Sequence, residues 1–132
     1  MHLKNSFLKR CQKMFSVGID LVEIERIEKS LKNEAFLQKY FGKKEITEFK
    51  SRNFKAETIA GAFAVKEAFL KSLGVGLGAY PLNEIEVLHK QSGAPYIFLS
   101  GKAKEENENK VFSLSITHTS TLAQAIVVAQ NK

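Results

Sequence analysis

The sequence predicts an α+β fold, in which one small domain packs a long central helix on an antiparallel sheet. Three observations predict it. Apolar and polar residues alternate at 15–21, helical spacing then dominates as far as about residue 73, and short alternating segments separated by turns fill the rest. Helices gathered in one part of the chain and strands in another are typical of α+β domains. A length of 132 residues corresponds to one domain.

The first half contains one strand and several helices. Phe15, Val17, Ile19 and Leu21 have the period-2 spacing of a strand, and apolar residues at helical spacing follow from about residue 23. Short helices are expected at 36–41 and 46–49. The longest helical signal covers 54–73, and Gly74 supplies its C-terminal stop.

The second half reads mainly as strands. Segments 85–87 and 96–99 are predicted strands around a turn at 89–95, and 100–110 is a short exposed helix. Segments 112–116 and 122–129 are predicted to form the last two strands, joined by a turn at 118–121. Residues 1–13 precede a second methionine, Met14, and we expect them to be an N-terminal extension of a domain at 14–132.

Composition narrows the range of partners and compartments. The chain has 20 Lys and Arg against 14 Asp and Glu, a net charge of +6, which suits nucleic acid, acidic proteins or polyphosphate ligands. A solvated basic surface without a specific partner is equally compatible with this charge. The one cysteine, Cys11, excludes an intramolecular disulfide and fits a reducing cytoplasm. No apolar run approaches the roughly 20 residues that span a bilayer, so we expect a cytoplasmic protein without a membrane segment.

The long helix carries two charges in an otherwise apolar stretch. Between Glu57 and Lys71, only Lys66 and Glu67 are ionisable, and such a helix is expected to be buried. Glu67 and Lys71 are four residues apart and can project together. Glu67 and Lys71 either form a plain helix ion pair or hold a cation and an anionic ligand. As a further structural interpretation, Lys66 extends its charge to solvent along its apolar stem.

Asp20 supplies a second carboxylate at the end of the first strand. With Glu23 it has the spacing of a capping box for the following helix. Alternatively, Asp20 and Glu67 are the two protein ligands of a Mg²⁺ ion, which prefers hard oxygen ligands and retains several waters.

The C-terminal turn places His118 among hydroxyl side chains, which suits either an anion site or purely local hydrogen bonds. The glycine loop at 74–78 follows a helix rather than a strand, and is therefore not a dinucleotide-binding fingerprint.

Four segments together resemble one family: GIDLVEIERI (18–27), AGAFAVKEAFLKSLGVGLG (60–78), GAPY (93–96) and SLSITHTSTLAQAIVV (113–128). Their order and spacing are similar to those of the holo-acyl-carrier-protein synthase family, the small trimeric group of 4′-phosphopantetheinyl transferases. The resemblance covers about residues 14–128. It implies transfer of the 4′-phosphopantetheine arm of coenzyme A to a serine of an acidic apo-acyl carrier protein, in fatty acid biosynthesis. It also implies a homotrimer with active sites between subunits.

The resemblance assigns the catalytic residues by motif. Asp20 and Glu67 match the Mg²⁺-binding carboxylates, and Lys71 matches a lysine that contacts the diphosphate of coenzyme A. Charge that builds on the diphosphate during attack by the carrier serine would be offset there. The proton acceptor is either a water oriented by Asp20 or Glu67 itself.

The resemblance also assigns binding residues. His118 matches a histidine near the nucleotide phosphates, Gly93 and Pro95 match a turn near the adenine, and Arg26 matches an arginine that contacts the carrier protein. One position departs from the pattern, because Ala62 stands where relatives often have a coenzyme A-binding arginine. Either a nearby base such as Arg52 or Lys55 substitutes for it, or the nucleotide is held more weakly.

Two other functions are compatible with parts of the sequence. A basic nucleic-acid-binding module would explain the net charge, but not a glutamate inside an apolar helix. A different metal-dependent phosphoryl-transfer enzyme could use the same carboxylates, although the chain lacks the Walker-type loop of an NTPase.

Overall fold

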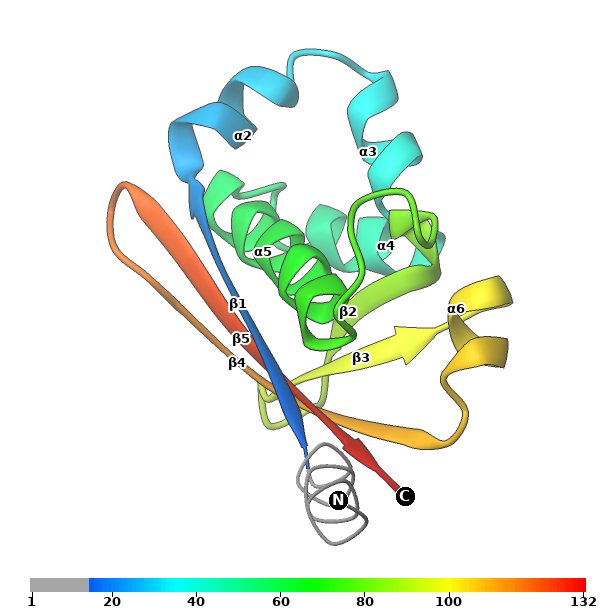
Figure 1. The fold of residues 1–132 in the computed structure, drawn as a ribbon. Helices are drawn as coiled ribbons and strands as arrows, with labels where there is room; N and C mark the ends of the chain where they lie inside the picture. Colours follow the sequence, from blue (N-terminus) through cyan, green and yellow to red (C-terminus); the bar gives the residue numbers. More distant parts are fainter. Residues whose placement is uncertain (1–14) are drawn as a thin grey trace, which may run out of the picture.

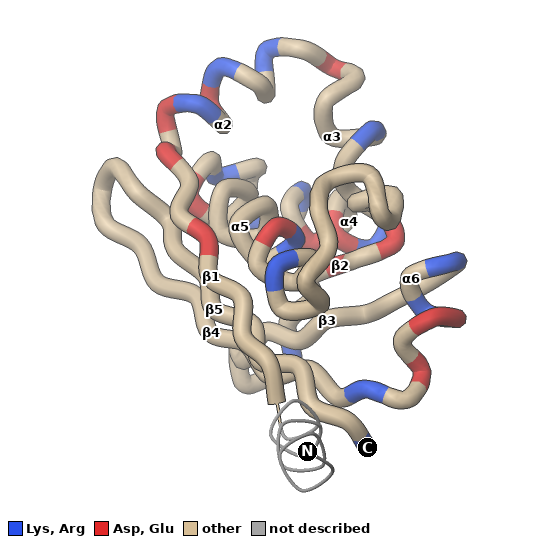
Figure 2. The backbone as a smooth tube through the Cα atoms, viewed as in Figure 1, with Lys and Arg blue, Asp and Glu red and all other residues tan. Residues whose placement is uncertain are grey.

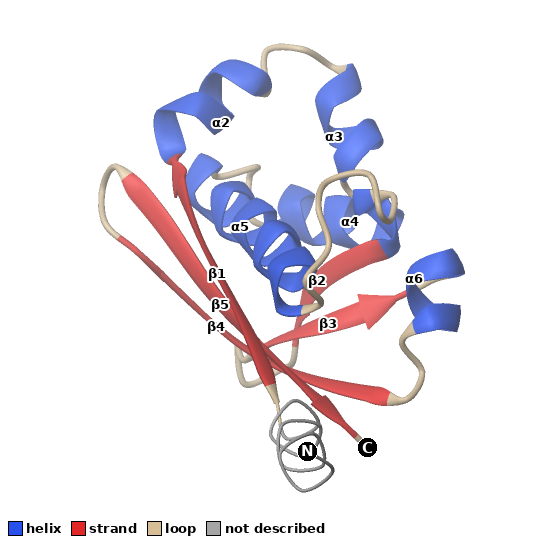
Figure 3. Ribbon diagram, in the orientation of Figure 1, coloured by secondary structure: helices blue, strands red, loops and turns tan. Residues whose placement is uncertain are grey.

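The fold is built around a long helix, α5 (Ala56–Ser72), which lies against a three-stranded antiparallel sheet (Figures 1 and 3). The computed structural model describes residues 15–132, so the predicted extension at 1–13 lies outside the described residues. The sheet contains β1 (Ser16–Glu23), β5 (Leu122–Asn131) and β4 (Lys110–His118), in that spatial order. The predicted α+β class, with a long helix on an antiparallel sheet, is confirmed.

The two strands in the middle of the chain form a separate sheet. β2 (Ile85–His89) pairs with β3 (Pro95–Leu99) in an antiparallel hairpin. Its turn includes Gly93, at φ 92°, as the Gly–Pro pattern predicted. The strand pattern alone did not show that the five strands divide between two sheets.

Short helices surround α5 and the β2–β3 hairpin, and α2 (Ile24–Ser30) packs directly on α5. α2, α3 (Ala35–Tyr40) and α4 (Lys43–Ser51) precede α5, while the 3-10 turn η1 (Leu82–Glu84) and α6 (Gly101–Glu106) follow it. α5 begins at Ala56 rather than at the predicted residue 54. The cause is a left-handed backbone at Asn53 (φ 57°) and Phe54 (φ 51°), which separates α4 from α5.

Lys66 lies wholly inside the protein, so the interpretation that it extends to solvent is wrong. Its Nζ donates hydrogen bonds to Glu45 Oε1 at 2.6 Å and to the carbonyl oxygens of Leu82, at 3.0 Å, and Ile85. Glu45 also accepts hydrogen bonds from the N–H groups of Gly42 and Val87. Burial raises the pKa of Glu45 and lowers that of Lys66, and the attraction between the two charges opposes both shifts. This satisfied pair joins α4, α5, η1 and β2.

The sheet has an unusual orientation, because its most regular apolar stripe faces away from α5. Ile19 and Leu21 on β1 are 52% and 56% exposed, while the alternate residues Gly18, Asp20 and Val22 face the helix. Ile126 on β5 pairs with Ile19 and shares the exposed side. We call Val17, Ile19, Leu21 and Ile126 the outer sheet face. Figure 2 shows that charged residues gather on the helices and turns, and that the three-stranded sheet carries few.

Candidate active site

The approach of β1 to α5 determines the position of Asp20. A Cβ atom at Gly18 would lie 1.9 Å from the carbonyl oxygen of Ala68, a distance that no side chain tolerates. Glycine therefore allows the strand to touch the backbone of the helix. Two residues further along β1, Asp20 then lies beside Lys71, whose Nζ is 3.2 Å from Asp20 Oδ1 and 3.0 Å from the carbonyl oxygen of Ile19.

Asp20 and Glu67 form a carboxylate pair. Burial is the main cause that raises the pKa of Glu67, and the adjacent charge of Asp20 raises it further. Arg26 and Lys71 lower that pKa and so oppose the shift. The side chain of Asp20 is only 9% exposed, and its Oδ2 atom is buried without a hydrogen-bond partner. A buried acceptor without a partner is costly, so this oxygen is suited to a ligand.

Two of the structural interpretations of these residues are wrong. β1 continues through Asp20 to Glu23, and the N-cap residue of α2 is Glu23, without a side-chain cap hydrogen bond. Asp20 and Glu23 therefore form no capping box. Lys71 pairs with Asp20 on the neighbouring strand, rather than with Glu67 on its own helix.

The chemistry of the carboxylate pair suits a divalent cation. Asp20 and Glu67 present adjacent carboxylates with one oxygen unpaired, and a positive ion would relieve both the repulsion and the missing contact. Residues 15–132 contain no group of three or more His, Cys, Asp or Glu side chains placed to hold a metal. Two carboxylates fit an ion such as Mg²⁺, which completes its shell with water and phosphate oxygens.

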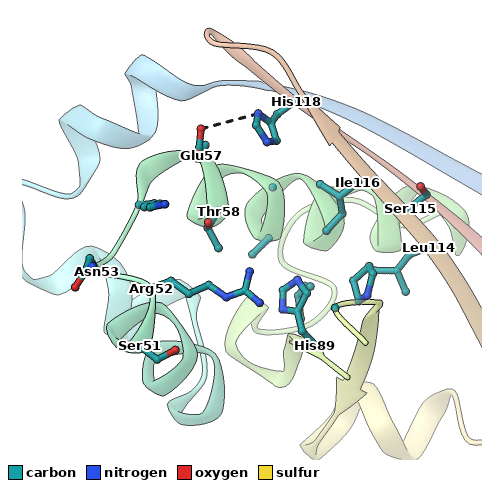
Figure 4. Close-up of a pocket in the computed structure, with 16 residues that line it drawn as sticks. Ser51, Arg52, Asn53, Glu57, Thr58, His89, Leu114, Ser115, Ile116 and His118 are labelled. Atoms are coloured by element: carbon teal, nitrogen blue, oxygen red, sulfur yellow. Dashed lines mark ion pairs between the residues drawn. The ribbon is translucent and has the colours of Figure 1, made fainter. Parts of the chain in front are cut away.

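A cavity of about 640 Å³ lies on another side of α5, between α4, the β2–β3 hairpin and β4 (Figure 4). We call it the basic cavity. Gly93, Pro95 and His118, which were predicted to bind one ligand, all line it. So do Arg52 and Lys55, the two bases considered as substitutes at Ala62, which itself lines the cavity.

The sequence did not single out His89, another basic residue of this cavity. Its position just before the Gly93–Pro95 turn, which was itself predicted to bind the ligand, could have indicated that His89 lies at the same cavity. His118 has its ring Nδ1 3.9 Å from Glu57 Oε2 and 3.3 Å from the carbonyl oxygen of Thr119. The local hydrogen-bond interpretation of His118 thus describes one of its contacts, while the ring also lies at the cavity.

Arg26 lies in a third place, on α2. Its guanidinium carbon is 6.0 Å from the centre of the Phe63 ring, and the two residues line a groove of about 420 Å³ with Phe36, Tyr40 and Lys39. We call this the α2–α3 groove. It combines aromatic surface with positive charge.

The structure thus separates the predicted catalytic residues from the predicted nucleotide-binding residues, and places Arg26 apart from both at the α2–α3 groove. Asp20, Glu67 and Lys71 lie together where β1 meets α5, whereas none of them lines the basic cavity. A paired carboxylate with an adjacent lysine, together with a basic cavity, suits metal-assisted phosphoryl transfer from a polyphosphate compound.

Comparison with known proteins identifies the family. Residues 16–126 match the model of the 4′-phosphopantetheinyl transferase superfamily. A holo-[acyl-carrier-protein] synthase of Clostridium botulinum (strain Eklund 17B / Type B) is 44% identical over 116 residues, covering 84% of this chain and 94% of that protein. The corresponding Fusobacterium nucleatum protein is 34% identical, covering 87% and 98%. The chain belongs to the 4′-phosphopantetheinyl transferase superfamily, as its motifs predicted.

Solved structures agree with this assignment. The Helicobacter pylori holo-[acyl-carrier-protein] synthase in complex with coenzyme A is 37% identical, with a TM-score of 0.77, over 86% of this chain and 99% of that one. The Bacillus anthracis synthase in complex with CoA (3′,5′-ADP) is 32% identical, with a TM-score of 0.76, over 89% and 96%.

The carboxylate pair makes a prediction that is independent of any activity. In an Asp20→Asn protein, we expect the pKa of Glu67 to fall towards its ordinary value, because a negative neighbour has been removed while burial remains. Carbon-13 NMR of the side-chain carboxyl groups during a pH titration would measure it. Glu57→Gln is the control, since it removes a carboxylate from the same helix and should leave the titration of Glu67 unchanged. An unchanged or higher pKa in Asp20→Asn would contradict the pairing.

Proposed function

We propose that the protein transfers the 4′-phosphopantetheine moiety of coenzyme A to a serine of an apo-acyl carrier protein and releases adenosine 3′,5′-bisphosphate. The observation that carries the proposal is the Asp20–Glu67 pair, with its unpaired buried oxygen and adjacent Lys71, on the fold of this superfamily. The names of the relatives and the coenzyme A complexes of the solved structures support it.

Asp20 and Glu67 would hold a Mg²⁺ ion in this proposal. When bound, the ion supplies positive charge that stabilises the diphosphate as negative charge builds on it. Lys71, with 57% of its side chain exposed, is free to turn from Asp20 towards the same phosphates and add a second positive charge.

The proposed reaction is a substitution at the β-phosphorus of coenzyme A. The serine oxygen of the carrier forms a bond to this phosphorus, and the bond between the phosphorus and the bridging oxygen breaks. The electron pair of that bond leaves with adenosine 3′,5′-bisphosphate. The serine proton passes either to a water oriented by Asp20 or to Glu67.

The basic cavity would hold the nucleotide end of coenzyme A. The turn with Gly93 and Pro95 would contact the adenine, and His118 would contact phosphate oxygens. Arg52 and Lys55 supply the positive charge that Ala62 cannot. This proposal favours substitution by nearby bases over weakened nucleotide binding.

A homotrimer with active sites between its subunits would unite the two groups of residues. The carboxylate pair of one subunit would then face the basic cavity of the next. The outer sheet face supports such an assembly, because a continuous, uncharged apolar surface is typical of an interface. Each subunit alone would hold only part of the site, so association through the outer sheet face would be needed to complete it.

The α2–α3 groove would receive the carrier protein. Arg26 and Lys39 supply positive charge for an acidic partner, and the aromatic side chains supply apolar contact. We also propose that the carrier is the acyl carrier protein of fatty acid synthesis and that the reaction takes place in the cytoplasm. No helix in residues 15–132 is long and apolar enough to cross a membrane.

The activity can be tested by intact mass spectrometry of an apo-acyl carrier protein after incubation with this protein, coenzyme A and Mg²⁺. We expect a gain of about 340 Da, which a chelator abolishes, because the pair holds the metal. Glu67→Gln should slow the transfer at least about a hundredfold, whereas the exposed control Glu108→Gln should not. Transfer at the normal rate by Glu67→Gln would refute the assigned role of the pair.

The carrier surface predicts a selective loss of affinity. Arg26→Glu should raise the KM for the carrier about tenfold and leave the KM for coenzyme A nearly unchanged, since only the carrier meets the α2–α3 groove. Lys104→Glu on α6 makes the same charge change elsewhere and should affect neither value. Equal losses for both substrates in Arg26→Glu would argue against this docking surface.

The assembly can be tested at the outer sheet face. Ile19→Glu combined with Ile126→Glu should convert a trimer to monomers in analytical ultracentrifugation and abolish transfer, because the site is then incomplete. Phe98→Glu changes an exposed apolar residue of β3 and should do neither. A monomeric double variant with full activity would show that one chain holds a complete site.

A further inference from the structure

His89 lies on the wall of the basic cavity, and the proposed chemistry leaves it without a role. It is the last residue of β2, and 18% of its side chain is exposed. The carboxylate of Glu48, on α4, contacts both the backbone and the ring of His89. The backbone N–H of His89 donates to Glu48 Oε1 at 3.1 Å, and the ring Nδ1 lies 3.1 Å from Glu48 Oε2. One carboxylate thus fixes both the strand end and the direction of the ring.

This contact determines what His89 can offer to a ligand. A carboxylate only accepts hydrogen bonds, so Nδ1 must carry the proton that it shares with Glu48. Only Nε2 remains for a ligand. In the neutral ring Nε2 has no proton and can only accept a hydrogen bond, whereas in the charged ring it can donate one. A phosphate oxygen, which is an acceptor, is therefore bound by the charged form of His89 alone.

The surroundings of the ring are rich in positive charge. Figure 4 shows the side chain of Arg52 extending across the cavity towards His89. Arg52 takes part in no ion pair among residues 15–132, and Lys55 lies at the same cavity. Among the acidic residues nearby, Glu57 pairs with His118 on β4 and Glu48 is occupied by His89. Lys90 follows His89 in the chain. The small side chain of Ala62 leaves room between these bases.

We propose that His89, positioned by Glu48, is a specificity-determining residue that donates a hydrogen bond from Nε2 to a phosphate monoester of the ligand, beside Arg52. The inference rests on the proposed function, in which the carboxylate pair and Lys71 take the diphosphate of coenzyme A. The remaining phosphate of coenzyme A is the monoester at the ribose 3′ position. A monoester carries about −1.5 to −2 charges near pH 7, which suits a site made from an arginine and a charged histidine.

Coenzyme A and 3′-dephospho-coenzyme A form a matched pair of substrates for the test, because they differ only in this phosphate. We define the preference as the KM for dephospho-coenzyme A divided by the KM for coenzyme A. In His89→Gln we expect this ratio to fall about tenfold, because the KM for coenzyme A rises. The kcat and the KM for dephospho-coenzyme A should stay unchanged. An unchanged reaction with dephospho-coenzyme A also shows that the variant is folded. Arg52→Gln should reduce the preference equally at low and high pH.

The pH dependence separates a bound histidine from a merely structural one. The wild-type preference should fall relative to His89→Gln as the pH is raised, because only the charged ring donates a hydrogen bond from Nε2. The free ligand ionises identically in both assays, so the ratio of the two preferences reports the difference that His89 makes. In Glu48→Gln, the amide can donate to Nδ1 and the neutral ring then carries its proton on Nε2. That variant should keep a preference that no longer changes with pH.

The outcomes distinguish this inference from the function on which it rests. A wild-type protein that transfers phosphopantetheine, and a His89→Gln protein with the full preference at both pH values, would overturn the inference alone. A Glu48→Gln protein with the wild-type pH dependence would overturn the positioning role of Glu48. If the wild type transfers nothing, calorimetric titration of both compounds into wild type and His89→Gln still measures the preference. A wild type that binds neither compound would overturn both proposals.

Discussion

The contact between Gly18 and the backbone of α5 is the constraint on which the proposed active site depends. Because position 18 has no Cβ atom, β1 crosses α5 in direct contact with Ala68. Alanines on α5 leave the space that this approach needs. The strand then presents Asp20 to Glu67 and Lys71, which come from a helix almost 50 residues later in the chain. A side chain at 18 would move β1 outwards and separate the carboxylates.

Two neighbouring residues of α5 show how differently a protein can treat buried charge. Lys66 is surrounded by acceptors, and its partner Glu45 accepts two further backbone hydrogen bonds. Such a pair is satisfied and serves to join elements. Glu67 instead faces another carboxylate, and Asp20 has a buried oxygen without a partner. The protein keeps this unfavourable arrangement in its folded state, which is expected where a ligand completes the site.

The sequence predicted most elements because local patterns determine them. The helical spacing of α5, the turn at Gly93 and the i,i+4 relation of Glu67 and Lys71 required no tertiary information. The partner of Lys71 could not be predicted, because it depends on how far β1 extends before α2 begins. The apolar stripe of β1 was also recognisable, but alternation alone does not show which face meets the helix. His89 was missed because its role depends on α4, which lies elsewhere in the sequence.

The carboxylate pair and the basic cavity lie on different sides of α5, and this separation is the physical argument for the proposed assembly. Glu67 and Ala62 lie on different sides of α5, since the carboxylate pair faces β1 and the basic cavity opens towards β4. A domain of this size has little interior beyond the core around α5, so a large nucleotide compound has no enclosed pocket within one copy. In the proposed assembly, a second copy joined through the outer sheet face would supply the missing wall without lengthening the chain. The proposed assembly would therefore explain both the exposed isoleucines of the sheet and the separation of the proposed site residues.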